Sequence, residues 1–230
     1  MNRDILNTLL LGGCFLALFA VGELLYHRFK VKAELTRKLI HFGTGLLTLL
    51  FPVLLGNHWL VLLLCGTFAV ILIVSLRCNL LQSINAIDRQ SIGSLSYPVS
   101  VYCCYRAFDH FGQQYLYFYL PVLILAICDP IAALTGKKWP VGPYRVRSER
   151  KSLLGSGMFF LTAFALAVAL PAALGHPFPA AALLLHAVVI AAVSAFTEGV
   201  STKGSDNLTI PAAVLLVMIV THFILNSHGN

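Results

Sequence analysis

Residues 153–174 read LLGSGMFFLTAFALAVALPAAL, a run without a single charged side chain. A helix needs about 20 apolar residues to cross roughly 30 Å of bilayer hydrocarbon, so this run predicts a transmembrane helix. The whole chain has the same character. Of its 230 residues, 58% are hydrophobic and 11% are charged, against roughly 25% charged in an average soluble domain. This composition excludes a cytosolic globular domain, a secreted disulfide scaffold and a disordered regulator.

Eight apolar segments can be counted, in one transmembrane domain that covers residues 1–230. They lie at about residues 5–26, 39–55, 59–76, 93–108, 115–136, 153–174, 179–199 and 208–226. The second and fourth are short or carry Ser, Tyr, Pro and Arg106. The runs lack the two-residue alternation of a membrane β-barrel. We therefore expect an all-α polytopic membrane protein with seven or eight transmembrane helices, some of them broken near the cytoplasmic face.

The basic residues lie in alternate linkers. Fourteen of the sixteen Lys and Arg residues lie in four linkers, at residues 27–38, 77–92, 137–152 and 200–207. Loops rich in Lys and Arg remain on the cytoplasmic side of a membrane. The pattern predicts four cytoplasmic loops and both termini outside. The compact length of 230 residues suggests the cell inner membrane. The net charge of +7 is thus explained by orientation, without a nucleic-acid polymer as partner.

Three of the nine acidic residues have unusual positions. Asp129 lies inside the fifth segment, about 10 Å along a helix from Gly136, while Glu198 ends the seventh segment and Asp206 opens the eighth. An ionisable group within a span costs about 2.5–3.5 kcal/mol, so it marks a functional site by default. Alternatively, Asp129 pairs with a basic neighbour to fix helix packing. Pro130 predicts a break in this helix, which needs a partner or a wet cavity.

The loop of residues 136–152 carries six positive charges and one negative charge. These charges either set orientation and contact anionic lipid headgroups, or form a cradle for a polyphosphate. The loop leads through Lys151 and Ser152 into the sixth segment, with Gly155 in its first turn. A helix N-terminus of this kind can bind an anion. The GxxxxGK[ST] pattern of a nucleotide-binding P-loop is absent from the chain.

A polar stretch joins the last two segments. Its residues Asp206, Asn207 and Thr209 offer oxygen ligands of the kind that Mg²⁺ accepts. The same Asp-Asn-x-Thr pattern is also a good helix cap. Together with Asp129 and the basic loop, the stretch places acids, oxygen ligands and cations on one membrane face. That combination indicates metal–nucleotide phosphate chemistry at the bilayer surface.

Four stretches at predicted cytoplasmic ends of spans resemble motifs of one known family. They are residues 34–45 (ELTRKLIHFGTG), residues 89–98 (RQSIGSLSYP), residues 129–136 (DPIAALTG) followed by 151–156 (KSLLGS), and residues 198–211 (EGVSTKGSDNLTIP). In this order they resemble the CTP-dependent lipid-alcohol kinases: dolichol kinase, phytol kinase and the yeast-type diacylglycerol kinase. That family is related to the phosphatidate cytidylyltransferases. Two positions depart from its pattern, since Cys128 stands where the family usually has Gly and Leu154 where it usually has Glu. These departures predict altered substrate choice or a loss of activity.

The resemblance implies transfer of the γ-phosphoryl group of CTP to a lipid alcohol, such as a polyprenol, a phytol-like prenol or diacylglycerol. It assigns Asp129 and Asp206 to Mg²⁺, with Asn207 in support. The residues that it assigns to the phosphates are Arg37, Lys38, Arg150, Lys151, Ser152 and Gly155. The general base is Glu198, His41 or Asp129, and Arg89, Gly93 and Pro98 shape the pocket. The lipid tail is expected between the spans, and related membrane enzymes suggest a homodimer.

Two other functions fit parts of the pattern. A cytidylyltransferase would share the metal and CTP site but would attack the α-phosphorus and form a CDP-lipid. A transporter would suit eight spans with broken helices. The motifs resemble the kinase branch more closely than the cytidylyltransferases. The sequence shows no convincing internal repeat, and its charges cluster at one membrane face and not at the midplane, so a transporter is disfavoured.

Overall fold

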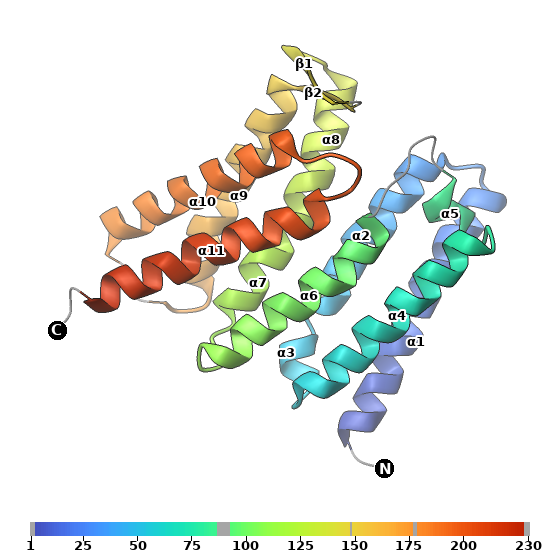
Figure 1. Cartoon of the computed structure of the whole chain (residues 1–230), viewed down its shortest axis with the longest axis horizontal. Helices are drawn as coiled ribbons and strands as arrows, with labels where there is room; N and C mark the ends of the chain where they lie inside the picture. The colour runs from blue at the N-terminus through green and yellow to red at the C-terminus, as the bar shows by residue number, and fades with distance from the viewer. Residues whose placement is uncertain (1–2, 87–92, 148, 177–178, 228–230) are drawn as a thin grey trace.

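The computed structural model describes residues 3–86, 93–147, 149–176 and 179–227, as a bundle of helices with one short β-hairpin (Figure 1). The helices are α1 (Arg3–His27), α2 (Ala33–Thr48), α3 (Phe51–Leu54), α4 (His58–Arg77), α5 (Gln82–Asn85), α6 (Gly93–His110), α7 (Leu116–Leu123), α8 (Asp129–Lys138), α9 (Leu153–Ala173), α10 (Ala180–Val200) and α11 (Asp206–Ser227). A π-helical turn, η1 (Ile124–Cys128), joins α7 to α8, and the hairpin strands are β1 (Pro143–Val146) and β2 (Glu149–Ser152). The predicted polytopic, almost wholly helical fold is confirmed.

Seven helical segments within the described ranges are long and apolar enough to cross a membrane. They are α1, α2 with α3, α4, α7 through α8, α9, α10 and α11. The remaining expected span corresponds to α6, an 18-residue helix that contains three serines, Pro98, and an ion pair between Arg106 and Asp109. Although α6 is too polar to qualify, it packs between α4 and α11 in the middle of the bundle.

The predicted basic linkers gather at one end of the bundle. The α1–α2 linker, α5, the β-hairpin and the α10–α11 loop lie at this end, and both chain termini lie at the other (Figure 1). We call it the basic end. Helix α2 begins at Ala33, earlier than the expected residue 39, with Lys32 as the residue before its first turn. Arg37 and Lys38 therefore lie on the helix itself and not in a flexible linker.

The break expected at Pro130 takes the form of the π-helical turn η1. Proline has no N–H, so Pro130 cannot donate to the carbonyl of Ala126, and a wider turn accommodates this gap. Pro130 lies in the first turn of α8, where its fixed φ fits a helix. The backbone of α2 comes so close to η1 that a Cβ on Gly45 would stand 2.3 Å from the Cβ of Ala126. A glycine is therefore required at this contact.

The β-hairpin within the loop of residues 136–152 was not predicted from the sequence. β1 and β2 pair antiparallel, and Arg147 takes a left-handed conformation (φ 51°) in the turn between them. The Tyr144 hydroxyl lies 2.8 Å from the Ser156 hydroxyl on α9. Glu149 accepts a hydrogen bond of 2.6 Å from the backbone N–H of Lys203 in the α10–α11 loop. These contacts fix the hairpin over the ends of α9 and α10.

Candidate active site

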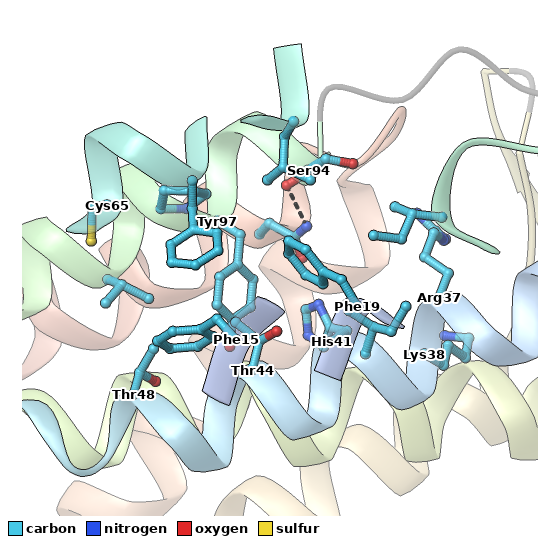
Figure 2. Close-up of a pocket in the computed structure, with 18 of the residues that line it drawn as sticks. Phe15, Phe19, Arg37, Lys38, His41, Thr44, Thr48, Cys65, Ser94 and Tyr97 are labelled. Carbon is cyan, nitrogen blue, oxygen red and sulfur yellow. Dashed lines mark hydrogen bonds between the residues drawn. The ribbon is translucent and has the colours of Figure 1, made fainter. Parts of the chain in front are cut away.

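A continuous cavity lies between α1, α2, α4 and α6 and reaches the first residues of α8 and α11. It encloses about 930 Å³ of space between the helices, a figure that includes the open solvent at its mouth. Its lining changes along its length: Arg37 and Lys38 lie at one end, and Thr48 and Cys65 lie at the other (Figure 2). The cavity is therefore polar near the basic end and apolar deeper in the bundle.

Helix α2 supplies one wall of the cavity along its whole length. Arg37, His41, Thr44 and Thr48 follow one another at intervals of three or four residues, the spacing that places side chains on one helix face. Arg37 and His41, four residues apart, therefore share this face. From Arg37 to Thr48 the helix rises by about 17 Å at 1.5 Å per residue. The wall thus leads from the basic end to about mid-bundle.

The polar end brings together residues that are far apart in the sequence. Lys38 on α2 lies 3.9 Å from the carboxylate of Asp129 on α8, and their side chains are 11% and 16% exposed. Asp206 and Asn207, at the start of α11, line the same cavity. Six of the predicted site residues meet here: Arg37, Lys38, His41, Asp129, Asp206 and Asn207.

Asn207 is held by contacts to α6. Its side-chain N–H donates to the carbonyl of Gly93 at 2.8 Å. Its backbone carbonyl accepts from the Ser100 hydroxyl at 2.5 Å. Because the amide nitrogen is engaged, the side-chain oxygen is the atom that remains for a ligand. Gly93 and Pro98, which were expected to shape the pocket, also line the cavity. Arg89 lies outside the described residues.

His41 lies between the polar and the apolar parts of the cavity. Its Nε2 is 3.2 Å from the carbonyl of Leu125 in η1, and its ring meets the edge of the Tyr97 ring at 4.8 Å between centroids. A carbonyl can only accept, so Nε2 carries the hydrogen and Nδ1 is the acceptor of the neutral ring. The π-helical turn thereby orients a histidine at the boundary.

A second lysine–carboxylate pair lies beneath the hairpin. Lys151 on β2 donates to a carboxylate oxygen of Glu198 at 2.8 Å and also to the backbone carbonyl of Glu198. Each side chain is 12% exposed. Neither residue lines the cavity, but Lys151 is close enough to Asp129 and Asp206 to interact with both electrostatically. The structure thus joins two predicted catalytic residues to each other.

The other predicted phosphate contacts lie outside the cavity. Ser152 caps α9, since its hydroxyl accepts from the backbone N–H of Gly155 at 3.1 Å. Gly155 faces α8 so closely that a Cβ there would stand 2.9 Å from the carbonyl of Ala132. Arg150 is exposed, and strand alternation turns its side chain away from the face of Lys151. Ser152 and Gly155 therefore join α8 to α9.

The oxygen donors in the cavity suit a hard divalent cation. Asp129 and Asp206 offer carboxylates, and Asn207 offers an amide oxygen. Among the described residues no group of three or more His, Cys, Asp and Glu side chains forms a metal site. Two carboxylates fit Mg²⁺ nonetheless, because this ion is usually held by one or two carboxylates together with substrate phosphates.

Comparison with known proteins yields one informative relative. The chain is 32% identical to a phytol kinase from Synechocystis sp. over 203 residues, which cover 87% of this chain and 85% of that protein. The chain belongs to the phytol kinase family. No family profile matches the chain, and no solved structure matches it. This membership confirms the resemblance to lipid-alcohol kinases that the four motifs suggested.

The sequence of this phytol kinase family member did not reveal which apolar residues line the cavity. Phe15 and Phe19 on α1 and Phe68 on α4 line the cavity, although neither helix carries a recognised motif. Phe15 and Phe19 are four residues apart, a spacing that puts two rings on one helix face. That pattern marks a buried face but does not distinguish a packed core from a ligand cavity.

Proposed function

We propose that the protein phosphorylates a lipid alcohol of the phytol class, with CTP as phosphoryl donor, at the cytoplasmic face of the membrane. The observation that carries this proposal is the change of lining within one cavity. Cations, two carboxylates and a histidine line the end near the basic loops, and rings and aliphatic side chains line the rest. A lipid alcohol has the same division, since one hydroxyl ends a long apolar chain.

The phosphates of the nucleotide are assigned to Arg37 and Lys38. Both line the polar end, on the first turns of α2. Phosphoryl transfer depends mainly on positioning and on neutralising the charge of the transferred group. Lys151 remains paired with Glu198 and adds positive electrostatic potential at the polar end of the cavity. The donor is taken to be CTP because the motifs resemble those of CTP-dependent kinases.

Asp129 and Asp206 would hold Mg²⁺, with the side-chain oxygen of Asn207 in support. When bound, the ion neutralises phosphate charge and holds the nucleotide in one orientation. The chain's own residues prepare this arrangement. Lys38 lies beside Asp129, and the contact with Gly93 fixes the amide of Asn207.

The alcohol is assigned to the boundary at His41, because the cavity changes there from polar to apolar. The hydroxyl donates to Nδ1, the acceptor that the contact with Leu125 leaves available. As the alcohol oxygen bonds to the γ-phosphorus, the bond from that phosphorus to the β–γ bridging oxygen breaks. The hydroxyl proton passes to Nδ1 and CDP leaves. Glu198 is less suited to this role, since Lys151 occupies its carboxylate.

The proposal is tested by the products formed from labelled nucleotides. Detergent-purified protein is incubated with Mg²⁺, phytol and either γ-labelled CTP, α-labelled CTP or γ-labelled ATP. A kinase transfers the γ-label to the lipid and releases CDP, whereas a cytidylyltransferase needs a phosphorylated lipid and transfers the α-label. We expect γ-label on the lipid, more from CTP than from ATP.

A pair of variants connects the activity to the site. Asp206→Asn should remove most of the label transfer, because Asp206 lines the polar end. Asp109→Asn is the matched control, since Asp109 is a partly exposed partner of Arg106 on α6, outside the cavity. Equal activity in both variants, or label transfer from neither nucleotide to any alcohol, would contradict the proposal.

A further inference from the structure

The deep part of the cavity is lined by side chains that are nearly buried. Five of its apolar lining residues come from α1, α4 and α6: Phe15 is 3% exposed, Phe19 7%, Leu64 6%, Phe68 9% and Val101 2%. An open groove between spans would leave such residues in contact with lipid. We call this part, lined by these five residues with Phe51 and Cys65, the tail compartment.

The tail compartment has a floor. Phe51, at the start of α3, is 2% exposed, and behind it the Phe118 ring stacks at 6.5 Å between centroids. α2 ends at Thr48, and the short α3 carries Phe51 to the inner end of the α2 wall. From Arg37 to Thr48, the last residue of α2, the helix rises by about 17 Å, and Phe51 begins the next short helix. A chain that starts at the polar end thus meets packed core after that distance.

The walls of the tail compartment are largely aromatic. Phe15 lies between Phe51 and Phe68, at ring-centroid distances of 5.9 and 5.0 Å, and Phe19 contacts Phe68 at 5.7 Å. This connected set of rings borders one passage, enclosed by α1, α2, α4 and α6. A branched single chain fits such a passage, whereas a lipid with two acyl chains would need a second exit.

We propose that the tail compartment holds the whole apolar chain of a single-chain prenyl alcohol, and that its floor at Phe51 sets the longest chain that the protein accepts. This inference rests on the proposed kinase function, which supplies the polar end for the hydroxyl. It goes further in locating the chain of that alcohol and in naming the residue that limits the chain length. The floor would exclude long polyprenols, and the single passage would exclude diacylglycerol with its two acyl chains.

Photo-crosslinking tests the location of the chain without any catalysis. A prenyl alcohol with a diazirine at its tail end is added to the protein in nanodiscs, without nucleotide, and labelled peptides are mapped. We expect labels on peptides of α1, α4 and the segment around Phe51, and competition by unlabelled phytol. Labels confined to the outer faces of α9 and α10 would overturn the inference.

Chain-length profiles test the floor. kcat/KM is measured for prenols of increasing length in the native protein, in Phe51→Leu, and in Cys65→Phe, which fills the compartment. We expect Phe51→Leu to raise the ratio of longer to native-length substrate by about 10-fold, and Cys65→Phe to shift the cut-off to shorter chains. Phe159→Leu is the control, because Phe159 is fully buried on α9 outside the cavity. Identical profiles in all four proteins, or equal use of diacylglycerol, would overturn the floor.

The two experiments separate this inference from the proposed function. Crosslinks in α1 and α4 without phosphorylation of any alcohol would leave the tail site standing and remove the kinase. Phosphorylation of prenols with crosslinks elsewhere would keep the kinase and remove the tail site. If Phe51→Leu does not fold, Val101→Ala enlarges the same compartment from α6.

Discussion

Two lysine–carboxylate pairs near the basic end have almost the same burial but different geometry. The side chains of Lys38 and Asp129 are 11% and 16% exposed, and those of Lys151 and Glu198 are each 12% exposed. Lys38 stands 3.9 Å from its partner, at the limit of an ion pair, and both residues line the cavity. Lys151 is hydrogen-bonded at 2.8 Å, and the carbonyl of Glu198 accepts from it as well.

The difference teaches which charges are available to a ligand. A lysine with two close acceptors is satisfied, and separating it from them costs energy. A loose pair that faces a cavity loses little interaction energy when a phosphate or a metal ion replaces one partner. Burial alone does not separate the two cases. We therefore expect changes to the cavity pair to affect activity, and changes to the hairpin pair to affect stability.

Asp129→Asn should have the largest effect on activity. The substitution keeps the shape of the side chain but removes the charge beside Lys38, so a preorganised electrostatic contact is lost. We expect kcat/KM to fall by about 10²–10³-fold, with a thermal midpoint close to that of the native protein. Retained activity would place the reacting phosphates away from Lys38 and Asp129. It would then be wrong that this pair serves activity while the hairpin pair serves stability.

Glu198→Gln should have the largest effect on stability. It leaves the ammonium of Lys151 largely buried without an opposite charge, and breaking such a pair costs about 3–5 kcal/mol. The measurement is thermal or denaturant unfolding in detergent. The double variant Lys151→Met with Glu198→Leu should recover most of the stability, because both charges are then removed.

A substitution of Lys151 tests directly whether the hairpin pair is only structural. If Lys151→Met abolished label transfer while the protein melted at the native temperature, Lys151 would have to leave Glu198 and bind the nucleotide. The role that the resemblance implied for Lys151 would then be correct, and the tight pair would be a resting arrangement.

Lys38→Met measures how much the cavity pair contributes to CTP binding. Lys38 lines the polar end, so we expect KM for CTP to rise by about 10-fold, equivalent to roughly 1.4 kcal/mol, with little change in stability. Lys137→Met is the control. Lys137 pairs with Glu34 on the exposed surface of the basic end, where an ion pair contributes about 0–1 kcal/mol. A larger effect in the control than in Lys38→Met would contradict the assignment.

Much of the fold could be predicted because it depends on composition along the chain. Apolar runs such as residues 153–174 gave the spans, and the alternation of basic linkers gave the end at which they gather. The cavity residues could be predicted for a related reason. His41, Asp129 and Asp206 lie in motifs that meet at one membrane face once the spans are antiparallel.

What could not be predicted depends on contacts between distant segments. Lys151 and Glu198 are 47 residues apart, and nothing in either local sequence says that they pair. The hairpin is stabilised by contacts of Tyr144 and Glu149 with α9 and the α10–α11 loop, again beyond local sequence. The rings of α1 and α4 look like any buried helix face until the cavity that they enclose is seen.

Ser152→Ala is the smallest of the expected effects, and it tests a residue whose two readings predict opposite results. In the structure its hydroxyl caps α9 by accepting from Gly155 at 3.1 Å, so its loss should cost about 1 kcal/mol of stability. KM for CTP should stay within about 2-fold, since losing a cap leaves the cavity lining intact. Ser152→Asp should restore the stability, because aspartate also caps helices well. If Ser152 held a phosphate instead, KM would rise in Ser152→Ala, and the aspartate would weaken CTP binding further by repelling it.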